Sequence, residues 1–189
     1  YTVTATDAST QAYVVTVTVA APVDVVFDTS GNLGAGTYNN ITVNSPSIVT
    51  VSGDVAVIGC VTVNSGGTLL MGGFTFTGPG CFALNSGGTL GIGSAAGIAS
   101  GAEGNIQTAT RAFDPGATYL YNGTASQFAG NALPSPVANL TIANTGGPGN
   151  DKVTGNPGQA VMGLLKVQQG TYASASDYVD VQIDPVGTL

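Results

Sequence analysis

The chain has no histidine and no tryptophan, and its 189 residues include only 3 lysine or arginine side chains. Without histidine, the most common general base and metal ligand in proteins are missing. The formal net charge of −7 excludes a surface built to neutralise nucleic-acid phosphates. No apolar run approaches the roughly 18 residues of a membrane-spanning helix. The composition therefore predicts no cofactor, no nucleic-acid partner and no membrane insertion.

Glycine is abundant, with 29 residues, and 43% of the chain is hydrophobic. This hydrophobic content is enough for a core, so the scarcity of charge does not indicate disorder. The length fits one domain, or one domain and a fragment of another. The chain begins at Tyr1 without a methionine or a signal-peptide pattern, so we expect a processed chain or a piece of a longer one.

Two stretches of alternating β-branched residues, Tyr1–Thr6 and Tyr13–Val19, flank the polar segment Asp7–Thr10. This pattern predicts a β-hairpin with a short turn. The pattern resembles the last two strands of cadherin-like or immunoglobulin-like sandwich modules of bacterial surface proteins. The resemblance implies that residues 1–22 are the end of a truncated sandwich, or a hairpin that caps the domain beginning at residue 23.

From about residue 37 the sequence repeats itself. Asn40–Ser45 aligns with Cys60–Ser65 and then with Cys81–Ser86, at offsets of 20 and 21 residues. The segment Gly66–Leu69 recurs as Gly87–Leu90. Such a fixed offset is the sequence signature of a repeat architecture.

A fourth copy, Ala112–Tyr119, aligns with Ala83–Leu90 at an offset of 29 residues. The longer offset predicts one repeat plus an excursion through the Gly/Ala-rich stretch Ala95–Gly104. Weaker copies follow at Asn139–Ile142 and Leu164–Val167. A period near 21 residues matches one turn of a β-solenoid, in which three short strands are joined by tight turns.

We therefore predict an all-β fold in which residues 23–189 form a parallel β-solenoid (β-helix) with about 21 residues per turn. Apolar residues alternate within each copy, so one face of each strand is expected to point inward. The extra residue of the second repeat is assigned to the turn Gly66–Thr68. With that assignment, Leu69 is expected to lie between Ile48 and Leu90.

Short polar residues occupy the position after the strand in four copies: Asn44, Asn64, Asn85 and Asp114. We interpret them as residues that cap the following turn. The alternative fold is an antiparallel β-sandwich or jelly roll, which also needs many short strands with Gly/Pro turns. That alternative does not predict identical residues at a fixed offset.

Three later segments carry a second resemblance: Gly104–Arg111, Tyr119–Gln127 and Leu133–Ile142. They are similar to repeat regions of very large, adhesin-like secreted surface proteins of Bacteroidetes-type bacteria. The resemblance implies a structural or adhesive segment, a stalk or adhesin module, of an extracellular cell-surface protein and not an enzyme. Its implied partners are neighbouring modules of the same chain, like subunits, or surface glycans. The alternatives are a self-assembling filament or sheath subunit, and a non-catalytic part of a carbohydrate-active solenoid protein.

Cys60 and Cys81 occupy the same position in successive repeats. In a solenoid they would be neighbours at about 4.8 Å, a separation that a disulfide accepts. We therefore predict a disulfide, and two stacked free thiols are the alternative. Two thiols without histidine do not complete a metal site.

Few other residues suggest chemistry. Gly146–Thr154 fits a calcium-binding nonapeptide with Asp151 as its candidate ligand, but a single copy supplies half a site and a plain loop is the simpler interpretation. Tyr119 and Tyr121 alternate along one strand, so we expect one of them to face out, where it could stack on a sugar or dock a partner. The densest acidic group is interpreted as solvated loop carboxylates: Asp177, Asp180 and Asp184.

Overall fold

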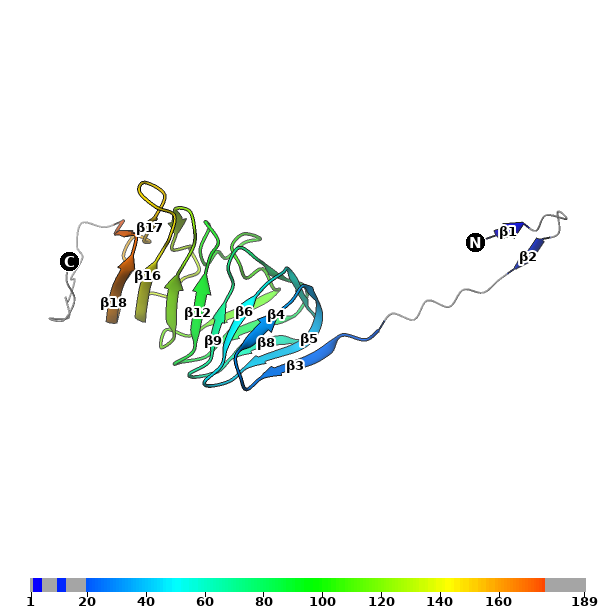
Figure 1. Cartoon of the computed structure of the whole chain (residues 1–189). Helices are drawn as coiled ribbons and strands as arrows, with labels where there is room; N and C mark the ends of the chain where they lie inside the picture. Colours follow the sequence, from blue (N-terminus) through cyan, green and yellow to red (C-terminus); the bar gives the residue numbers. More distant parts are fainter. Residues whose placement is uncertain (1, 5–9, 13–19, 176–189) are drawn as a thin grey trace.

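The structure is a computed structural model that describes residues 2–4, 10–12 and 20–175, the last range with side chains (Figure 1). Every regular element in these ranges is a β-strand, and none is a helix, so none could cross a membrane as a helix. All strand pairs within residues 20–175 are parallel. The fold is therefore all-β with parallel sheets, and these strands do not form the antiparallel sandwich.

One seven-stranded sheet takes its strands in sequence order, but successive strands are separated along the chain by strands of other sheets (Figure 1). Its members are β4 (Gly31–Leu33), β6 (Ile48–Val51), β9 (Thr68–Leu70), β12 (Thr89–Ile92), β14 (Thr118–Tyr121), β16 (Val137–Ala143) and β18 (Val161–Gln169). Neighbouring strands in this sheet therefore come from successive repeats of the sequence.

A second seven-stranded sheet is strongly curled. Its members are β3 (Val23–Phe27), β5 (Gly36–Val43), β7 (Val55–Val57), β8 (Cys60–Val63), β10 (Phe76–Thr77), β11 (Cys81–Leu84) and β13 (Thr110–Phe113). The start of β5 pairs with β7, whereas its end pairs with β3 and β8, so the sheet turns a corner along this one strand.

A three-stranded sheet contains β15 (Gln127–Phe128), β17 (Lys152–Thr154) and β19 (Thr171–Ala173). The chain thus moves back and forth between the two seven-stranded sheets up to β14, and from there between the first of these sheets and the three-stranded one.

The N-terminal hairpin is not supported in its predicted form. The structure pairs β1 (Thr2–Thr4) with β2 (Thr10–Ala12) in an antiparallel arrangement. Thr10, which the sequence pattern places in the turn, therefore belongs to a strand. The predicted second strand, Tyr13–Val19, lies outside the described residues.

The core consists of columns of apolar side chains that stack from strand to strand. One column crosses the first sheet: Val49, Leu69, Leu90, Tyr119 and Leu140. All five side chains are fully buried. Because residues two apart share a face of a strand, each strand adds a second buried position to the next column. Burial of these stacked side chains is the main favourable contribution to folding.

The predicted register is wrong by one residue at Leu69. The structure pairs Leu69 with Val49, whereas Ile48 faces outward and is 49% exposed. The offset is still 20 residues where Thr50 pairs with Leu70, and it becomes 21 where Val55 pairs with Phe76. The extra residue therefore lies in the corner 71–75, where Gly72 has a φ of +53°. Glycine accepts this left-handed conformation without strain, so this corner accommodates the insertion.

The three asparagines interpreted as turn caps instead bond to one another and form a ladder of side-chain amides along the stack. Asn64 Nδ2 donates to Asn44 Oδ1 at 2.7 Å, and Asn85 Nδ2 donates to Asn64 Oδ1 at 2.9 Å. The ladder ends on Asp28, whose Oδ1 accepts from Asn44 at 2.8 Å. In the fourth copy Asp114 instead accepts from the backbone N–H of its own turn, at Gly116. The ladder joins successive repeats independently of the backbone hydrogen bonds.

The expectation that Tyr119 or Tyr121 faces out is wrong. Both side chains are fully buried, because residues two apart in a strand share a face. The Tyr119 hydroxyl donates to the Asp114 carbonyl at 2.7 Å, and the Tyr121 hydroxyl donates to the Ala129 carbonyl at 2.5 Å. Neither ring is available to an external ligand.

These buried phenols make the fold sensitive to alkali. Desolvation by burial raises the pKa of both Tyr119 and Tyr121 above the ordinary value of 10.0. A raised pKa in the folded state means that the stabilisation is complete below about pH 10 and decreases above it. We expect a loss of about 1.4 kcal/mol per pH unit per tyrosine. Urea unfolding from about pH 8 to about pH 11 measures this slope. The Tyr121→Phe variant should show a shallower decline, and an equal decline would contradict the assignment.

Candidate functional site

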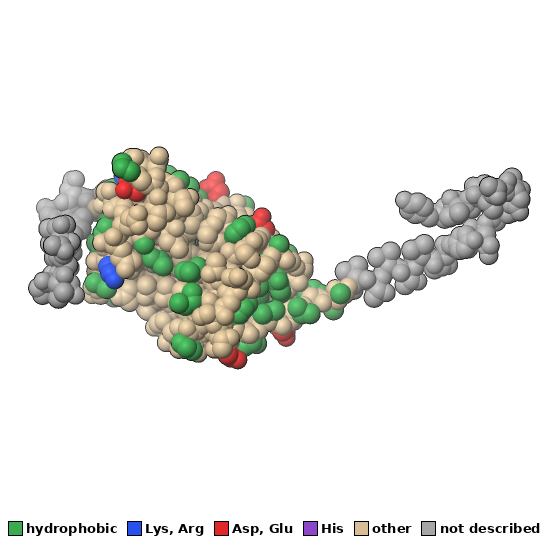
Figure 2. Space-filling model, viewed as in Figure 1, with side chains coloured by type: hydrophobic (Ala, Val, Ile, Leu, Met, Phe, Trp, Pro, Cys, Tyr) green, Lys and Arg blue, Asp and Glu red, His purple; other side chains and the backbone are tan. Residues whose placement is uncertain are grey.

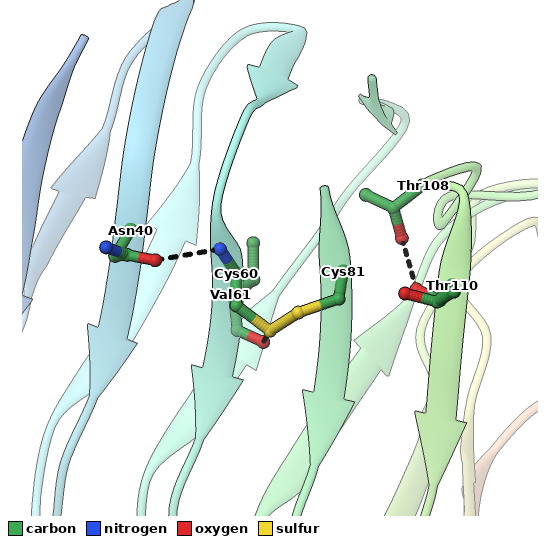
Figure 3. The surroundings of a disulfide bond; sticks show 6 residues. All are labelled: Asn40, Cys60, Val61, Cys81, Thr108 and Thr110. Atoms are coloured by element: carbon green, nitrogen blue, oxygen red, sulfur yellow. Dashed lines mark hydrogen bonds between the residues drawn. A yellow bond between two sulfur atoms is a disulfide. The ribbon is translucent and has the colours of Figure 1, made fainter. Parts of the chain in front are cut away.

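The predicted disulfide is present. Cys60 in β8 and Cys81 in β11 are bonded, with their Cα atoms 4.5 Å apart (Figure 3). Their strands pair in register, and the adjacent residues Val61 and Phe82 are buried, so the cysteines face outward. The backbone N–H of Cys60 donates to Asn40 Oδ1 of the preceding strand at 2.9 Å. A disulfide of this kind is typical of an oxidising environment.

The predicted excursion leaves the repeat after β12 and returns before β13. Its first half is attached to β15 and to the segment that follows β15 by backbone hydrogen bonds. Ile98 N donates to Ala129 O at 3.0 Å, and Phe128 N donates to Ala95 O at 2.8 Å. Further along, Ser100 N donates to Asn131 Oδ1 at 2.8 Å. These contacts fasten one side of the excursion to the next repeat.

Arg111 holds the other side of the excursion. It pairs in register with the buried Phe82, which places its side chain on the inward-facing side of the strand, where it is half-buried. Its guanidinium donates to backbone carbonyls of the excursion: Ala99, Ser100, Gly101 and Ile106, at 2.7–3.0 Å. This role was missed from the sequence, although the offset of 29 residues that aligns Ala112 with Ala83 also places Arg111 at an apolar position.

Replacing Arg111 by methionine should open the excursion locally. Methionine keeps an apolar stem but leaves the carbonyls without their charged donor, and hydrogen bonds to charged groups contribute about 1.5–3 kcal/mol. We expect hydrogen exchange at the Ile98 and Ala132 amides to become at least about tenfold faster. The exposed Lys166→Met variant is the control. Unchanged exchange in the Arg111 variant would show that the guanidinium does not hold this segment.

Two buried amide side chains, those of Asn105 and Gln127, bond to the backbone at the point where the excursion leaves β12. Asn105 is buried, and its Nδ2 donates to the carbonyls of Gly72 and Phe74 while its Oδ1 accepts from Gly93 and Ser94. The side chain of Gln127 likewise donates through its amide nitrogen and accepts through its amide oxygen. Its Nε2 donates to Ile92 O, and its Oε1 accepts from Asn144 Nδ2 at 2.9 Å. Because each amide bonds through both ends, the corner is fixed by side chains as well as by backbone.

A groove of about 650 Å³ lies between the excursion and the corners that follow β15 and β17. Its polar lining comes from Ser100, Glu103, Asn131 and Asn156, and its apolar lining from alanine residues and Phe128. Phe128 is 64% exposed, more than the other phenylalanines of residues 20–175. The groove therefore combines a hollow, an exposed aromatic ring and polar groups.

A smaller hollow of about 410 Å³ lies on the other side of Ser100 and is lined by Arg111 and Phe113. Its arginine is already engaged by the excursion carbonyls. We assign this hollow to the contact between Arg111 and the excursion and not to a separate site.

The described carboxylates mostly bond to the chain itself. Asp24 accepts from Asn39 and Asn40, and these bonds, led by the Asn40 backbone N–H, lower its pKa. Asp54 Oδ1 accepts from the N–H and the hydroxyl of Thr75. Within the described residues, no three Cys, Asp or Glu side chains are close enough to hold a metal ion.

Asp151 lies directly before β17, and its carbonyl accepts from Thr171 N at 3.1 Å. Its assignment as a calcium ligand stays a prediction. The acidic group Asp177, Asp180 and Asp184 lies outside the described residues.

Comparison with known proteins gives no relative. No protein-family model, no curated protein and no solved structure matches the chain.

Proposed function

We propose that residues 23–189 form a β-solenoid that serves as a structural and adhesive segment, a stalk or adhesin module, of a large secreted bacterial cell-surface protein. The observation that carries the proposal is the in-register parallel pairing of strands from successive repeats. Cys81 pairs with Cys60 on one side, and strand β11 that contains it pairs with β13 on the other. Each further repeat that stacks in this way lengthens the molecule along a single axis, and a stalk requires such an elongated shape.

In the proposed role, the segment carries mechanical load. Separating two neighbouring turns requires breaking the backbone ladder between them. In this chain it also requires breaking side-chain links that run along the stack, which are the asparagine ladder from Asp28 to Asn85 and the Cys60–Cys81 disulfide. The segment is therefore built to resist extension along the stacking direction. Figure 2 shows few charged side chains on the viewed face, which suits a surface that interacts weakly with its surroundings.

Electron microscopy and small-angle X-ray scattering of the 189-residue chain test the stalk. We expect short, elongated particles of uniform length whose dimensions do not change with protein concentration. A compact particle would contradict the proposed stack. Reduction of the disulfide should leave the shape intact while lowering the force at which the turns separate.

A self-assembling filament or sheath subunit is the second candidate. Apolar side chains are exposed on the outermost strands of the described region: Val23, Val26, Met162, Leu164 and Val167. Unpaired strand edges with apolar residues favour pairing with another chain. In the same microscopy experiment this function predicts fibres that lengthen as the concentration rises.

A further inference from the structure

The groove between the excursion and the corners after β15 and β17 leaves several hydrogen-bonding groups unused by the protein. Asn131 uses its Oδ1 to accept from Ser100 N, so its Nδ2 is available to donate. Asn156 uses its Nδ2 to donate to Gly130 O, so its Oδ1 is available to accept. Among residues 20–175, the Glu103 carboxylate and the Ser100 hydroxyl have no side-chain partner.

These groups include both donors and acceptors, and they line the same groove as Phe128, whose ring is exposed. A sugar presents hydroxyl groups that donate and accept at its edge and apolar C–H groups on its face. The face suits the ring of Phe128, and the edge suits the amides and the carboxylate. A pocket with an apolar wall and a few polar groups that fix orientation is the usual form of a small-molecule site. Its volume of about 650 Å³ is large enough for a short oligosaccharide.

We propose that this groove binds a neutral oligosaccharide, with Phe128 as the stacking platform and Glu103, Asn131 and Asn156 as hydrogen-bonding partners. The proposal rests on the adhesive role proposed above and gives that role a site and a ligand class.

The charge of the groove disfavours the other ligand classes. Its one ionisable side chain is the carboxylate of Glu103, so an anionic ligand such as a phosphate or a uronic acid would be repelled. A single carboxylate does not complete the oxygen shell that calcium requires. A neutral, polyhydroxylated ligand needs neither a cation nor a second acid.

The walls of the groove are held in place before any ligand arrives. One wall is the excursion, which is fixed by Arg111 and by its backbone bonds to the segment 128–132. In the opposite wall, Gly130 has a φ of +90°, and a Cβ there would collide with the backbone of Ile98. The close approach of the two walls thus depends on glycine. Such preorganisation lowers the entropy cost of binding.

The test uses the 189-residue chain and a panel of neutral oligosaccharides, namely cellohexaose, laminarihexaose, mannohexaose and chitohexaose, with trigalacturonate as the acidic comparison. Binding is measured by saturation-transfer difference NMR and by calorimetry. We expect the chain to bind at least one neutral oligosaccharide and not trigalacturonate. Phe128→Ala should weaken that binding by at least about tenfold, which corresponds to roughly 1.4 kcal/mol.

The matched control is Phe74→Ala, which removes a 36% exposed phenylalanine outside the groove and should leave binding unchanged. Glu103→Ala is a second variant, chosen because an exposed side chain without partners can be removed without affecting folding. It should also weaken binding, whereas Phe128→Tyr should retain it.

Three results would overturn the proposal: no binding to any neutral member of the panel, preference for trigalacturonate, or equal binding by wild type and Phe128→Ala. The microscopy and scattering experiment described above tests the stalk separately from the sugar site. Elongated particles without sugar binding would overturn the groove and leave the structural role. Sugar binding by compact particles would support the groove and overturn the stalk.

Discussion

Replacing Phe82 by alanine is expected to destabilise the chain by about 3–5 kcal/mol, as is usual for a fully buried phenylalanine. Phe82 is 1% exposed and lies between two other rings, with centroid distances of 6.5 Å to Phe76 and 5.6 Å to Phe113. Alanine would leave a cavity among stacked layers that are held in place by their own strand pairing, so the site would collapse little.

The measurement is the urea midpoint followed by far-ultraviolet circular dichroism. The Phe128→Ala variant is a matched control, because the same deletion at an exposed ring should change stability by less than about 0.5 kcal/mol. If the two variants unfolded at the same urea concentration, Phe82 would not be part of a packed core.

Loss of the Cys60–Cys81 disulfide should destabilise the chain by about 3 kcal/mol. The bond closes a loop with a sequence separation of 21 residues, and opening it restores conformational entropy to the unfolded chain. The cysteines face outward from paired strands, so a Cys60→Ser/Cys81→Ser double variant should lose the covalent link while keeping the packing.

Urea unfolding of the double variant and of the reduced wild-type chain should give the same lowered midpoint. The control is Thr62→Ala, an outward position on the same strand β8, which should have little effect. A wild-type midpoint that does not respond to reductant would show that the bond does not contribute to stability.

The strand register follows from the sequence wherever a repeat contains a distinctive residue. The matches between Cys60 and Cys81, between Ala83 and Ala112, and between Leu140 and Leu165 are all observed pairs. Stacking places like positions together, so a sequence offset becomes a spatial neighbour. Between such residues the sequence does not determine the register, and the structure places the extra residue in the corner 71–75 and not in the turn Gly66–Thr68.

The candidate groove was not predictable in the same way. Phe128 belongs to a strand of two residues, too short for a period to be recognised, and the excursion interrupts the repeat at the point where the groove forms. The residues that shape it bond to backbone atoms far along the chain. Gln127, for example, donates to the carbonyl of Ile92.

By itself, the sequence determined that the chain is all-β, that its apolar residues alternate, and that matching residues of successive repeats lie side by side, because strand periodicity and the repeat can be read from the order of the residues. The tertiary structure alone decided that Tyr119 and Tyr121 are both internal, that Arg111 clamps the excursion, and that a groove opens beside Phe128. Those features depend on which backbone carbonyls lie within reach of a side chain after the chain has turned. A local sequence pattern does not specify these contacts, because they join residues that are far apart along the chain.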